Sequence, residues 1–354
     1  MKHKRIEKLQ NIMYKKNIDV ALISNILNIQ YFSDLTSLTH DEPSAYLLVT
    51  QNDTILLCSE LEASRVKNET GVSPILLSHD INLKKYVSNL SEKNFSFGFD
   101  SLSIPFYEYL KNKFKKVIDI NPDIYQLRSI KSNEEISLVK TACEITTKTL
   151  SKIPDLIKPG MTEKDLAIEI EFCARKLGAD ESAFSPIVAF GKNSALPHWR
   201  PSENVIGKNN ILLIDYGARY KGYCADFTRI YSIGKPPEKL MNAWNLVINA
   251  FEKSVEKASA GIKTNNVFLE AVNTFKNERL DDFFIHSLGH GVGLAVHESP
   301  RISSNEDILK KNMIITIEPG LYFNGIGGIR IENTFKVNDE NISSLSNIDY
   351  IISL

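Results

Sequence analysis

Five side chains of the metal-ligand type constrain this chain more than any other feature, because each lies in an apolar strand-like segment or in a glycine-rich one. They are Asp215 in ILLIDYG, Asp226 in YCADFTR, His290 in HSLGHGVG, Glu318 in ITIEPG and Glu332 in GIRIENT. A carboxylate buried in apolar surroundings is destabilising by several kcal/mol unless a positive charge compensates it. Any fold that buries these segments must therefore bring cations to the four acids.

The arginines of the same segments cannot supply enough positive charge. Only Arg229 and Arg330 lie there, against four acids. One divalent ion would also be outweighed by four carboxylates, whereas two ions bridged by shared carboxylates and a water suit four acids and one imidazole. The residues therefore indicate a dinuclear metal hydrolase.

The first two acids flank a predicted hairpin. Residues 210–214 and 227–232 are strand-like runs, with Asp215 at the end of one and Asp226 before the other. A turn centred on residues 220–221 makes the two acids direct cross-strand partners, which destabilises a ladder unless a cation lies between them. A single acid would more simply end a strand, but two acids in register favour metal binding.

The last two acids belong to a second predicted pair of strands. Residues 313–317 and 328–335 have the composition of strands. Because side chains alternate along a strand, Glu318 shares a face with Thr316, and Glu332 shares a face with Arg330. A surface glutamate on an edge strand would explain one of these acids but explains both poorly.

The histidines of the same region differ in their expected roles. His286 and His290 are four residues apart, as in the HExxH motif of zinc peptidases, but position 287 is serine and no glutamate follows His286. We therefore expect His290 as the single nitrogen ligand and His286 as a structural residue. His297 in VHESP and His198 in ALPHWRP remain. Beside a metal cluster, their N–H groups suit donation to a developing oxyanion or to a substrate group.

Glycine usage divides the chain into two parts. Of seventeen glycines, only Gly71 and Gly98 precede residue 130, and glycine permits unusual backbone angles and close approach to ligands. We therefore predict a smaller α/β domain at residues 1–122, which ends at a break at Asn121-Pro122 and carries no catalytic residue, and a catalytic domain at residues 130–354. The strands expected in the first domain are residues 20–23, 46–49, 54–58 and 95–99.

The order helix, glycine break, helix, strands occurs twice in the second domain. The pattern SNEE at residues 132–135 predicts a capping box, and Thr162 is placed to cap the next helix. The repeated order suggests two structurally similar halves. The four helices are expected at residues 132–150, 162–174, 243–258 and 267–275.

Charge and composition exclude some classes of partner. The net charge of −1 provides no electrostatic case for binding a nucleic acid or an anionic membrane. No run approaches the ~18 apolar residues of a spanning helix, and no signal segment follows the basic N-terminus. The scattered cysteines form no CxxC pair, so we expect each to be a small buried hydrophobe in a reducing cytoplasm. They are Cys58, Cys143, Cys173 and Cys224.

Six ordered segments carry a family resemblance. NSALPH, LLIDYG, CADFTR, HSLGHGVGLAVHESPRIS, ITIEPGLY and GIRIENT resemble the blocks of the pita-bread metallopeptidases, specifically the branch of proline dipeptidase and aminopeptidase P. The resemblance covers residues 130–354, and the first part is similar to the N-terminal domain of that branch. It implies an α/β fold with pseudo-twofold halves. Methionine aminopeptidases share the ligands but usually lack the N-terminal domain and the ALPH and VHESP blocks. Creatinase-like members share the fold but not the ligands.

The resemblance also implies a role for each ligand. Asp226 and Glu332 would bridge two divalent metal ions, Asp215 would chelate one ion, and His290 and Glu318 would complete the other. A bridging hydroxide would attack the peptide carbonyl, with Glu318 as general base and then acid. Oxygen-rich ligation favours Mn²⁺ or Co²⁺, with Fe²⁺ or Zn²⁺ also compatible.

Substrate residues follow from the same resemblance. His297 and His198 would stabilise the tetrahedral intermediate and hold the substrate. Arg330 is suited to a bidentate contact with a substrate carboxylate, although it could instead orient Glu332. The expected reaction is hydrolysis of Xaa-Pro bonds, with dipeptides preferred, by a homodimer.

Two departures from the branch and three rival functions stay open. Asn333 stands where the branch often has aspartate, and Trp199-Arg200 follows His198 where a small residue is common. The second departure bears on the substrate pocket. The rivals are an aminopeptidase P acting on longer peptides, a hydrolase of a non-peptide amide, and a non-catalytic binding module. The last should have lost ligands, and none is lost.

Overall fold

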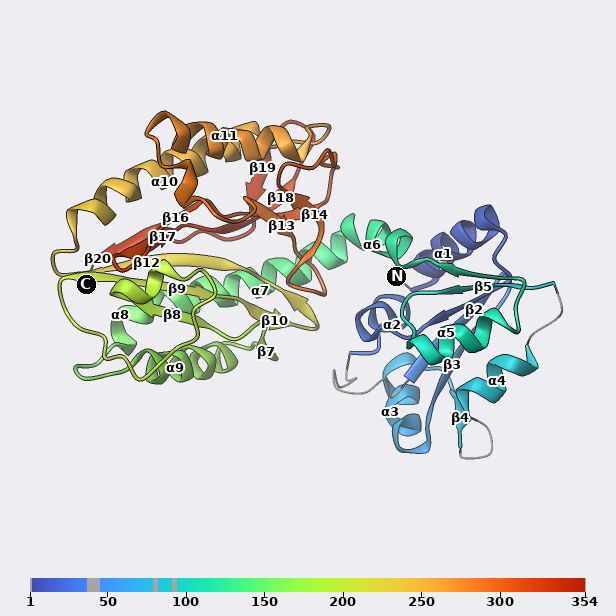
Figure 1. The fold of residues 1–354 in the computed structure, drawn as a ribbon. Coiled ribbons are helices and arrows are strands. Elements are labelled where there is room, and N and C mark those ends of the chain that lie inside the picture. Colours follow the sequence, from blue (N-terminus) through green and yellow to red (C-terminus); the bar gives the residue numbers. More distant parts are fainter. Residues whose placement is uncertain (1, 37–44, 79–81, 91–93, 354) are drawn as a thin grey trace. The chain divides into compact units, whose positions relative to one another are not determined.

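The computed structural model describes residues 2–36, 45–78, 82–90 and 94–353, and the chain divides into two compact units, Met1–Arg128 and Ser129–Leu354 (Figure 1). The predicted domain limits, residues 1–122 and 130–354, leave a short connection between them. That connection is not a break, because Asn121 and Pro122 begin the helix α6 (Asn121–Ser129). Proline is favourable in the first turn of a helix, where its missing N–H has no partner to lose.

The first unit is a six-stranded sheet with helices. The strand order is β4-β3-β2-β1-β5-β6, and β1, β5 and β6 run parallel. The predicted hairpin is confirmed, since β2 and β3 pair antiparallel with Val49 opposite Thr54. The strands are β1 (Val20–Ile23), β2 (Ala45–Thr50), β3 (Thr54–Ser59), β4 (Ile75–Leu77), β5 (Ser96–Phe99) and β6 (Lys116–Asp119). The helices before α6 are α1 (Lys2–Lys16), α2 (Ile26–Ser33), α3 (Glu60–Thr70), α4 (Leu83–Asn89) and α5 (Ile104–Lys111).

The helices of the second unit confirm the twofold repetition of helix pairs. Both predicted N-terminal caps form, since Ser132 and Thr162 each complete a capping box. One helix begins at Glu238 rather than at the predicted Ala243, and Leu240 in its first turn is already buried. The helices are α7 (Asn133–Ser151), α8 (Ile153–Leu156), α9 (Glu163–Lys176), α10 (Glu238–Lys257) and α11 (Thr264–Asn277).

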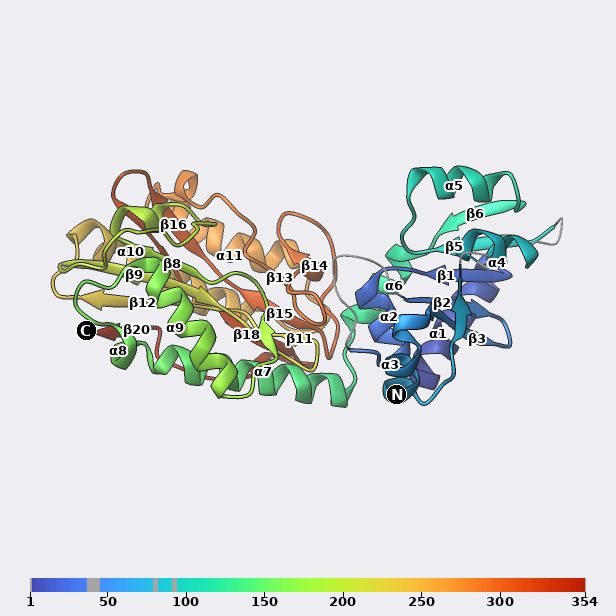
Figure 2. The same ribbon diagram turned by 90° about the horizontal axis from the view of Figure 1, so that it is seen from below.

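Two larger sheets carry the second unit, and their strands pair antiparallel except that the C-terminal strand β20 runs parallel to β12. Their strand orders are β20-β12-β9-β8 and β14-β13-β15-β18-β19, and two smaller sheets, β11-β10-β7 and β16-β17, accompany them. Figures 1 and 2 show these strands between α10 and α11 on one side and α7 and α9 on the other. The strands are β7 (Glu181–Ser182), β8 (Ile187–Phe190), β9 (Asn210–Tyr216), β10 (Ala218–Tyr220), β11 (Tyr223–Cys224), β12 (Phe227–Ile233), β13 (Gly289–Gly291), β14 (Glu298–Ile302), β15 (Ile314–Ile317), β16 (Gly320–Phe323), β17 (Gly327–Arg330), β18 (Asn333–Val337), β19 (Ile342–Ser344) and β20 (Ile351–Ser353).

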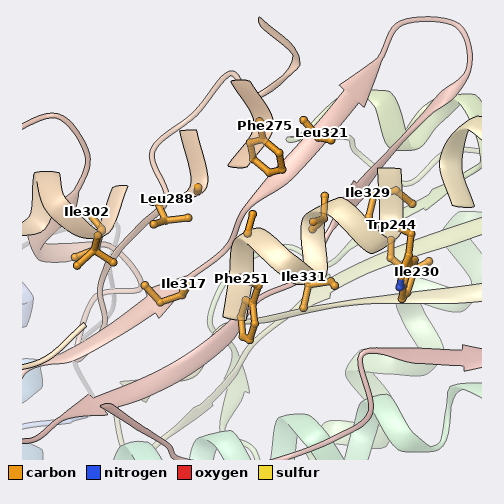
Figure 3. Packing of buried hydrophobic residues seen from close by; sticks show 14 of the residues in the cluster. Ile230, Trp244, Phe251, Phe275, Leu288, Ile302, Ile317, Leu321, Ile329 and Ile331 are labelled. Carbon is orange, nitrogen blue, oxygen red and sulfur yellow. The ribbon is translucent and has the colours of Figure 1, made fainter. Parts of the chain in front are cut away.

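A large hydrophobic core lies between the helices α10 and α11 and strands of both halves of the second unit (Figure 3). Trp244 and Phe251 of α10 are each 2% exposed and belong to one cluster with Ile317 and Ile329. Burying a side chain of this size contributes roughly 1.5–3 kcal/mol. This core holds the strands that end at the predicted ligands. Among the residues that the structure describes, no helix is both long and apolar enough to cross a membrane.

The predicted register of the first acid pair is wrong. Asp215 faces Thr228 across β9 and β12, so Asp226 is not its direct partner. The reversal is centred on Lys221 and Gly222, both at positive φ (47° and 82°), rather than on residues 220–221. Two consecutive residues at positive φ form the hairpin turn whose twist matches the strands.

The second predicted strand pair also differs from expectation. Residues 328–335 do not form one strand, because β17 ends at Arg330 and β18 begins at Asn333. The two strands belong to different sheets, β17 with β16 and β18 with β15. Glu332 therefore lies in the two-residue gap between β17 and β18 and is a member of neither sheet.

Candidate metal centre

The structure brings the five predicted ligands together. Ligand atoms of Asp226, His290 and Glu332 all lie within 4.8 Å of one another. Glu318 joins them, with its Oε1 3.3 Å from His290 Nε2. Asp215 is near enough to raise the pKa of Asp226, Glu318 and Glu332 by its charge. Four of the five residues are buried, and the Glu318 side chain is 16% exposed.

The imidazole of His290 is oriented as a metal ligand requires. Its Nδ1 lies 3.1 Å from the carbonyl of Gly291, which can only accept, so Nδ1 carries the proton. Nε2 then presents its lone pair to Asp226 Oδ2 at 3.6 Å and to Glu318 Oε1 at 3.3 Å. Burial, together with the charge of His297, lowers the pKa of His290 to about 3. The ring is therefore neutral and available for ligation at physiological pH.

The carboxylates are only partly compensated, because among the described residues the one arginine that pairs with the cluster, Arg330, forms its ion pair with Asp215. Burial, reinforced by the neighbouring acids, raises the pKa of Asp226 and Glu332 well above the ordinary range. Burial likewise raises the pKa of Glu318 to about 8. Among the described residues, Oδ1 of Asp215 and Oδ1 of Asp226 are buried with no hydrogen-bond partner. Orphaned carboxylate oxygens that converge with an imidazole lone pair fit divalent cations.

Three fully buried threonines hold the ligands. Thr228 Oγ1 donates to Glu332 Oε2 at 2.7 Å. Thr334 Oγ1 donates to the backbone carbonyl of Asp226 at 2.8 Å. Thr316 Oγ1 accepts from the backbone N–H of His290 at 3.1 Å. Each threonine is 0% exposed, so these contacts fix the ligands within a rigid shell.

Arg330 is engaged by several groups at once. Its guanidinium donates to Asp215 Oδ2 at 2.6 Å, to Thr228 Oγ1 at 2.9 Å and to the Tyr322 hydroxyl at 2.8 Å. Its side chain is only 3% exposed. Because Thr228 in turn donates to Glu332, Arg330 orients two predicted ligands, one directly and one through a hydroxyl.

The predicted substrate histidines lie at the solvent side of the cluster. The His297 ring lies edge-on to that of His290, with 4.2 Å between centroids, and it is exposed. His198 is exposed as well, and its charge helps to lower the pKa of His297 and of His286. His286 differs, since its Nδ1 donates to the Ser287 carbonyl and its Nε2 accepts from Tyr322.

The two departures noted in the sequence have structural partners. Asn333 accepts a 2.5 Å hydrogen bond from the buried guanidinium of Arg229. Arg229 donates otherwise to backbone carbonyls, including that of Glu332, and among the described residues no carboxylate pairs with it. Trp199 donates from its indole N–H to Glu163 at 2.9 Å. The polar edge of its ring therefore faces Glu163, which is not one of the predicted ligands.

The sequence did not identify Thr228 and Tyr322 as parts of this site. Thr228 lies two residues after Asp226, so the alternation of a strand places both on one face. Tyr322 had no such signal, because its hydroxyl meets Arg330 only through the pairing of β16 with β17. Thr228 holds the ligand Glu332 directly, whereas Tyr322 holds Arg330, which in turn binds Asp215.

Comparison with known proteins agrees with this geometry. Residues 137–339 match metallopeptidase family M24, and residues 5–130 match the creatinase/prolidase N-terminal domain. A Xaa-Pro dipeptidase of Pyrococcus furiosus is 35% identical over 351 residues, which cover 97% of each chain. The solved prolidase of Pyrococcus horikoshii OT3 has a TM-score of 0.91 at 34% identity and covers 98% of this chain and 99% of its own. The X-Pro aminopeptidase of Thermotoga maritima MSB8 has a TM-score of 0.89 at 33% identity, with 99% of each chain covered.

These similarities confirm the predicted pita-bread fold with its additional N-terminal domain. The matched region contains every predicted ligand, from Asp215 to Glu332. Because the match spans more than half of the chain and a relative is similar over nearly its whole length, the chain belongs to metallopeptidase family M24.

Proposed function

We propose that this protein is an exopeptidase that hydrolyses Xaa-Pro bonds with the help of two divalent metal ions, and that it prefers dipeptides. The observation that carries the proposal is the convergence of Asp226, His290 and Glu332 within 4.8 Å, with Glu318 and Asp215 beside them. The relative named a Xaa-Pro dipeptidase supports the choice of substrate.

The five residues would hold the ions as a set. Asp226 and Glu332 would be shared between both ions, Asp215 would bind one, and His290 and Glu318 would bind the other. The orphaned Oδ1 atoms of Asp215 and Asp226 support this assignment. When bound, the ions supply Lewis acidity and lower the pKa of a water molecule. Four oxygen donors and one nitrogen favour Mn²⁺ or Co²⁺ over Fe²⁺ or Zn²⁺.

Glu318 is the residue we assign to proton transfer. It is the most accessible of the five, with 16% of its side chain exposed, and Thr316 donates to its Oε1 at 3.4 Å. A carboxylate at the solvent edge of the cluster can take a proton from an attacking water and return it to the leaving amine.

His297 and His198 would contact the substrate. Both rings are exposed, and His297 lies against His290. An imidazole N–H at this place can donate to the carbonyl oxygen as negative charge develops on it. For Arg330, its burial and its bonds to Asp215 and Thr228 support the orienting role rather than a substrate contact.

The assembly and location of the protein are part of the proposal. We propose a homodimer that works in the cytoplasm on small peptides, with the two compact units, Met1–Arg128 and Ser129–Leu354, as separate domains. The four cysteines are buried free thiols, which suits a reducing compartment. Light scattering of the purified protein would report the mass of the assembly, and a monomer would contradict the dimer.

A substrate panel tests the proposed reaction. Metal-stripped protein is reconstituted with Mn²⁺, Co²⁺, Fe²⁺ or Zn²⁺ and assayed on Xaa-Pro, Xaa-Pro-Xaa and Xaa-Ala at equal concentration. We expect fastest turnover of Xaa-Pro. Faster turnover of the tripeptide would support the alternative that the Thermotoga maritima X-Pro aminopeptidase suggests. Equal turnover of Xaa-Ala would contradict proline specificity, and full activity after thorough chelation would contradict the metal requirement.

A further inference from the structure

The segment that carries His198 has little regular structure of its own. Residues 190–204, here called the histidine loop, contain one short 3₁₀ turn, Gly191–Ala195, and otherwise no helix or strand after β8. His198 is exposed near its middle. A side chain on such a segment holds a defined position only if other contacts fix the backbone around it.

One buried carboxylate provides most of these contacts. Oε1 of Glu163 accepts from the backbone N–H of Phe190 and from Asn193 Nδ2, both at 2.8 Å. Oε2 accepts from Trp199 Nε1 at 2.9 Å, from the backbone N–H of Ser202 at 3.1 Å and from Ser202 Oγ at 2.8 Å. These donors come from the start, the middle and the end of the histidine loop.

This carboxylate is buried without a cationic partner among the residues that the structure describes. Glu163 is 0% exposed, and no ion pair of those residues includes it. It is the first residue of α9, where the positive end of the helix dipole favours an anion. An ionised carboxylate only accepts hydrogen bonds, so every one of its contacts is a donor from the loop. The donors of the histidine loop therefore stabilise the buried carboxylate, and the carboxylate in turn stabilises the conformation of the loop.

His198 lies between two anchors. The residue before it, Pro197, accepts from Arg330 at 3.4 Å, and the residue after it, Trp199, donates to Glu163. The indole N–H of Trp199 supplies a donor that a smaller side chain at this position could not supply.

We propose that Glu163 is a positioning residue that fixes the histidine loop, so that His198 is held ready for the substrate. The inference rests on the proposed contact between His198 and the substrate. Glu163 does not touch the substrate or the ligands; it acts through Trp199 and Ser202.

Steady-state kinetics provide the first test. Glu163→Gln keeps the size of the side chain but turns an N–H toward the loop donors. We expect KM for Xaa-Pro to rise by about tenfold while kcat changes much less, because uniform binding of substrate is lost. Bound metal should equal that of the wild type. The matched control is Asp165→Asn on the same helix, since Asp165 is exposed and, among the described residues, its side chain accepts hydrogen bonds from Thr162 of the capping box alone. Its KM should stay at the wild-type value.

A spectroscopic readout makes the test independent of activity. The chain has two tryptophans, Trp199 and Trp244, and Trp244 is buried in α10. With 5-fluorotryptophan they produce two ¹⁹F resonances, which Trp199→Phe assigns. In Glu163→Gln the Trp199 resonance should shift and broaden while that of Trp244 stays unchanged. Unchanged resonances together with an unchanged KM in folded Glu163→Gln would overturn the proposal.

Two further variants separate the possible failures. If Glu163→Gln does not fold, Trp199→Phe removes one donor alone, and a wild-type KM in that variant would also overturn the proposal. His198→Ala tests the function on which the inference rests. If it leaves KM unchanged while Glu163→Gln still moves the Trp199 resonance, the substrate role of His198 fails, but Glu163 still positions the loop.

Discussion

The metal-free protein should lose stability as the pH rises from 6.5 to 8, because its buried acids must then ionise. Burial raises the pKa of Glu318 from 4.5 to about 8 and raises the pKa of Asp226 and Glu332 well above their ordinary values. In the unfolded chain these carboxyls lose their protons at much lower pH. Over the interval between the two pKa values the folded state therefore binds more protons, and the free energy of unfolding falls as pH rises.

The buried histidines set the lower limit of this interval. Burial lowers the pKa of His286 from 6.5 to about 4 and that of His290 to about 3. Below pH 6.5 the unfolded chain therefore binds protons that the folded protein does not, and the histidines make stability rise with pH. Above pH 6.5 the histidines of the unfolded chain lose their remaining protons, so their opposing effect fades and the acids dominate.

The size of the effect follows from the pKa of one residue. Between pH 6.5 and 8, Glu318 alone should lower the free energy of unfolding by about 2 kcal/mol, at about 1.4 kcal/mol per pH unit. Asp226 and Glu332 act in the same direction. Urea unfolding of chelator-treated protein at several pH values measures the slope. Metal-loaded protein should lack it, since ligation removes the protons, and Glu318→Gln should reduce it. Constant or rising stability of the metal-free protein would refute the reasoning.

Two further substitutions test individual roles. Thr228→Val removes the donor to Glu332 Oε2 and the acceptor for Arg330 Nε, so it should lower stability by roughly 1–3 kcal/mol and weaken metal binding. Calorimetric titration with Mn²⁺ checks the affinity, and a wild-type value would contradict the relay through Thr228. His297→Ala should lower kcat steeply while metal content and Tm stay near wild type, because the ring is exposed and occupies no ligand position. Loss of metal or of folding in that variant would instead indicate a structural role.

The ligand residues could be predicted because each one conflicts with its local sequence. Asp215 and Glu318 are acids at the ends of apolar strands, and His290 lies among glycines. Such residues are destabilising unless a site explains them, so they are visible without knowledge of the fold. The contacts that hold them have no such signature. Thr228 and Tyr322 are ordinary strand residues. Tyr322 reaches Arg330 through the pairing of β16 with β17, and Thr228 reaches it from β12, 102 residues away in the chain.

Chain reversals limited the prediction in a different way. The hairpin between β9 and β12 turns at Lys221 and Gly222, both at positive φ, and lysine carries no sequence signal for that conformation. The close approach of the strands was equally hidden. A Cβ at Gly217 would lie 1.8 Å from the carbonyl oxygen of Ala225, so only glycine permits the backbones to cross there.

The site prediction survived the wrong register because the error was an even number of residues. Side chains alternate between the faces of a strand, so a shift by two residues moves a partner along the ladder but keeps it on the same face. Asp215 therefore faces Thr228, and Asp226, two residues before Thr228, still lies on the face of Asp215. A shift by one residue would have placed Asp226 on the opposite face, away from His290 and Glu332. The parity of the pairing, rather than its register, decides whether the two acids can share a metal ion.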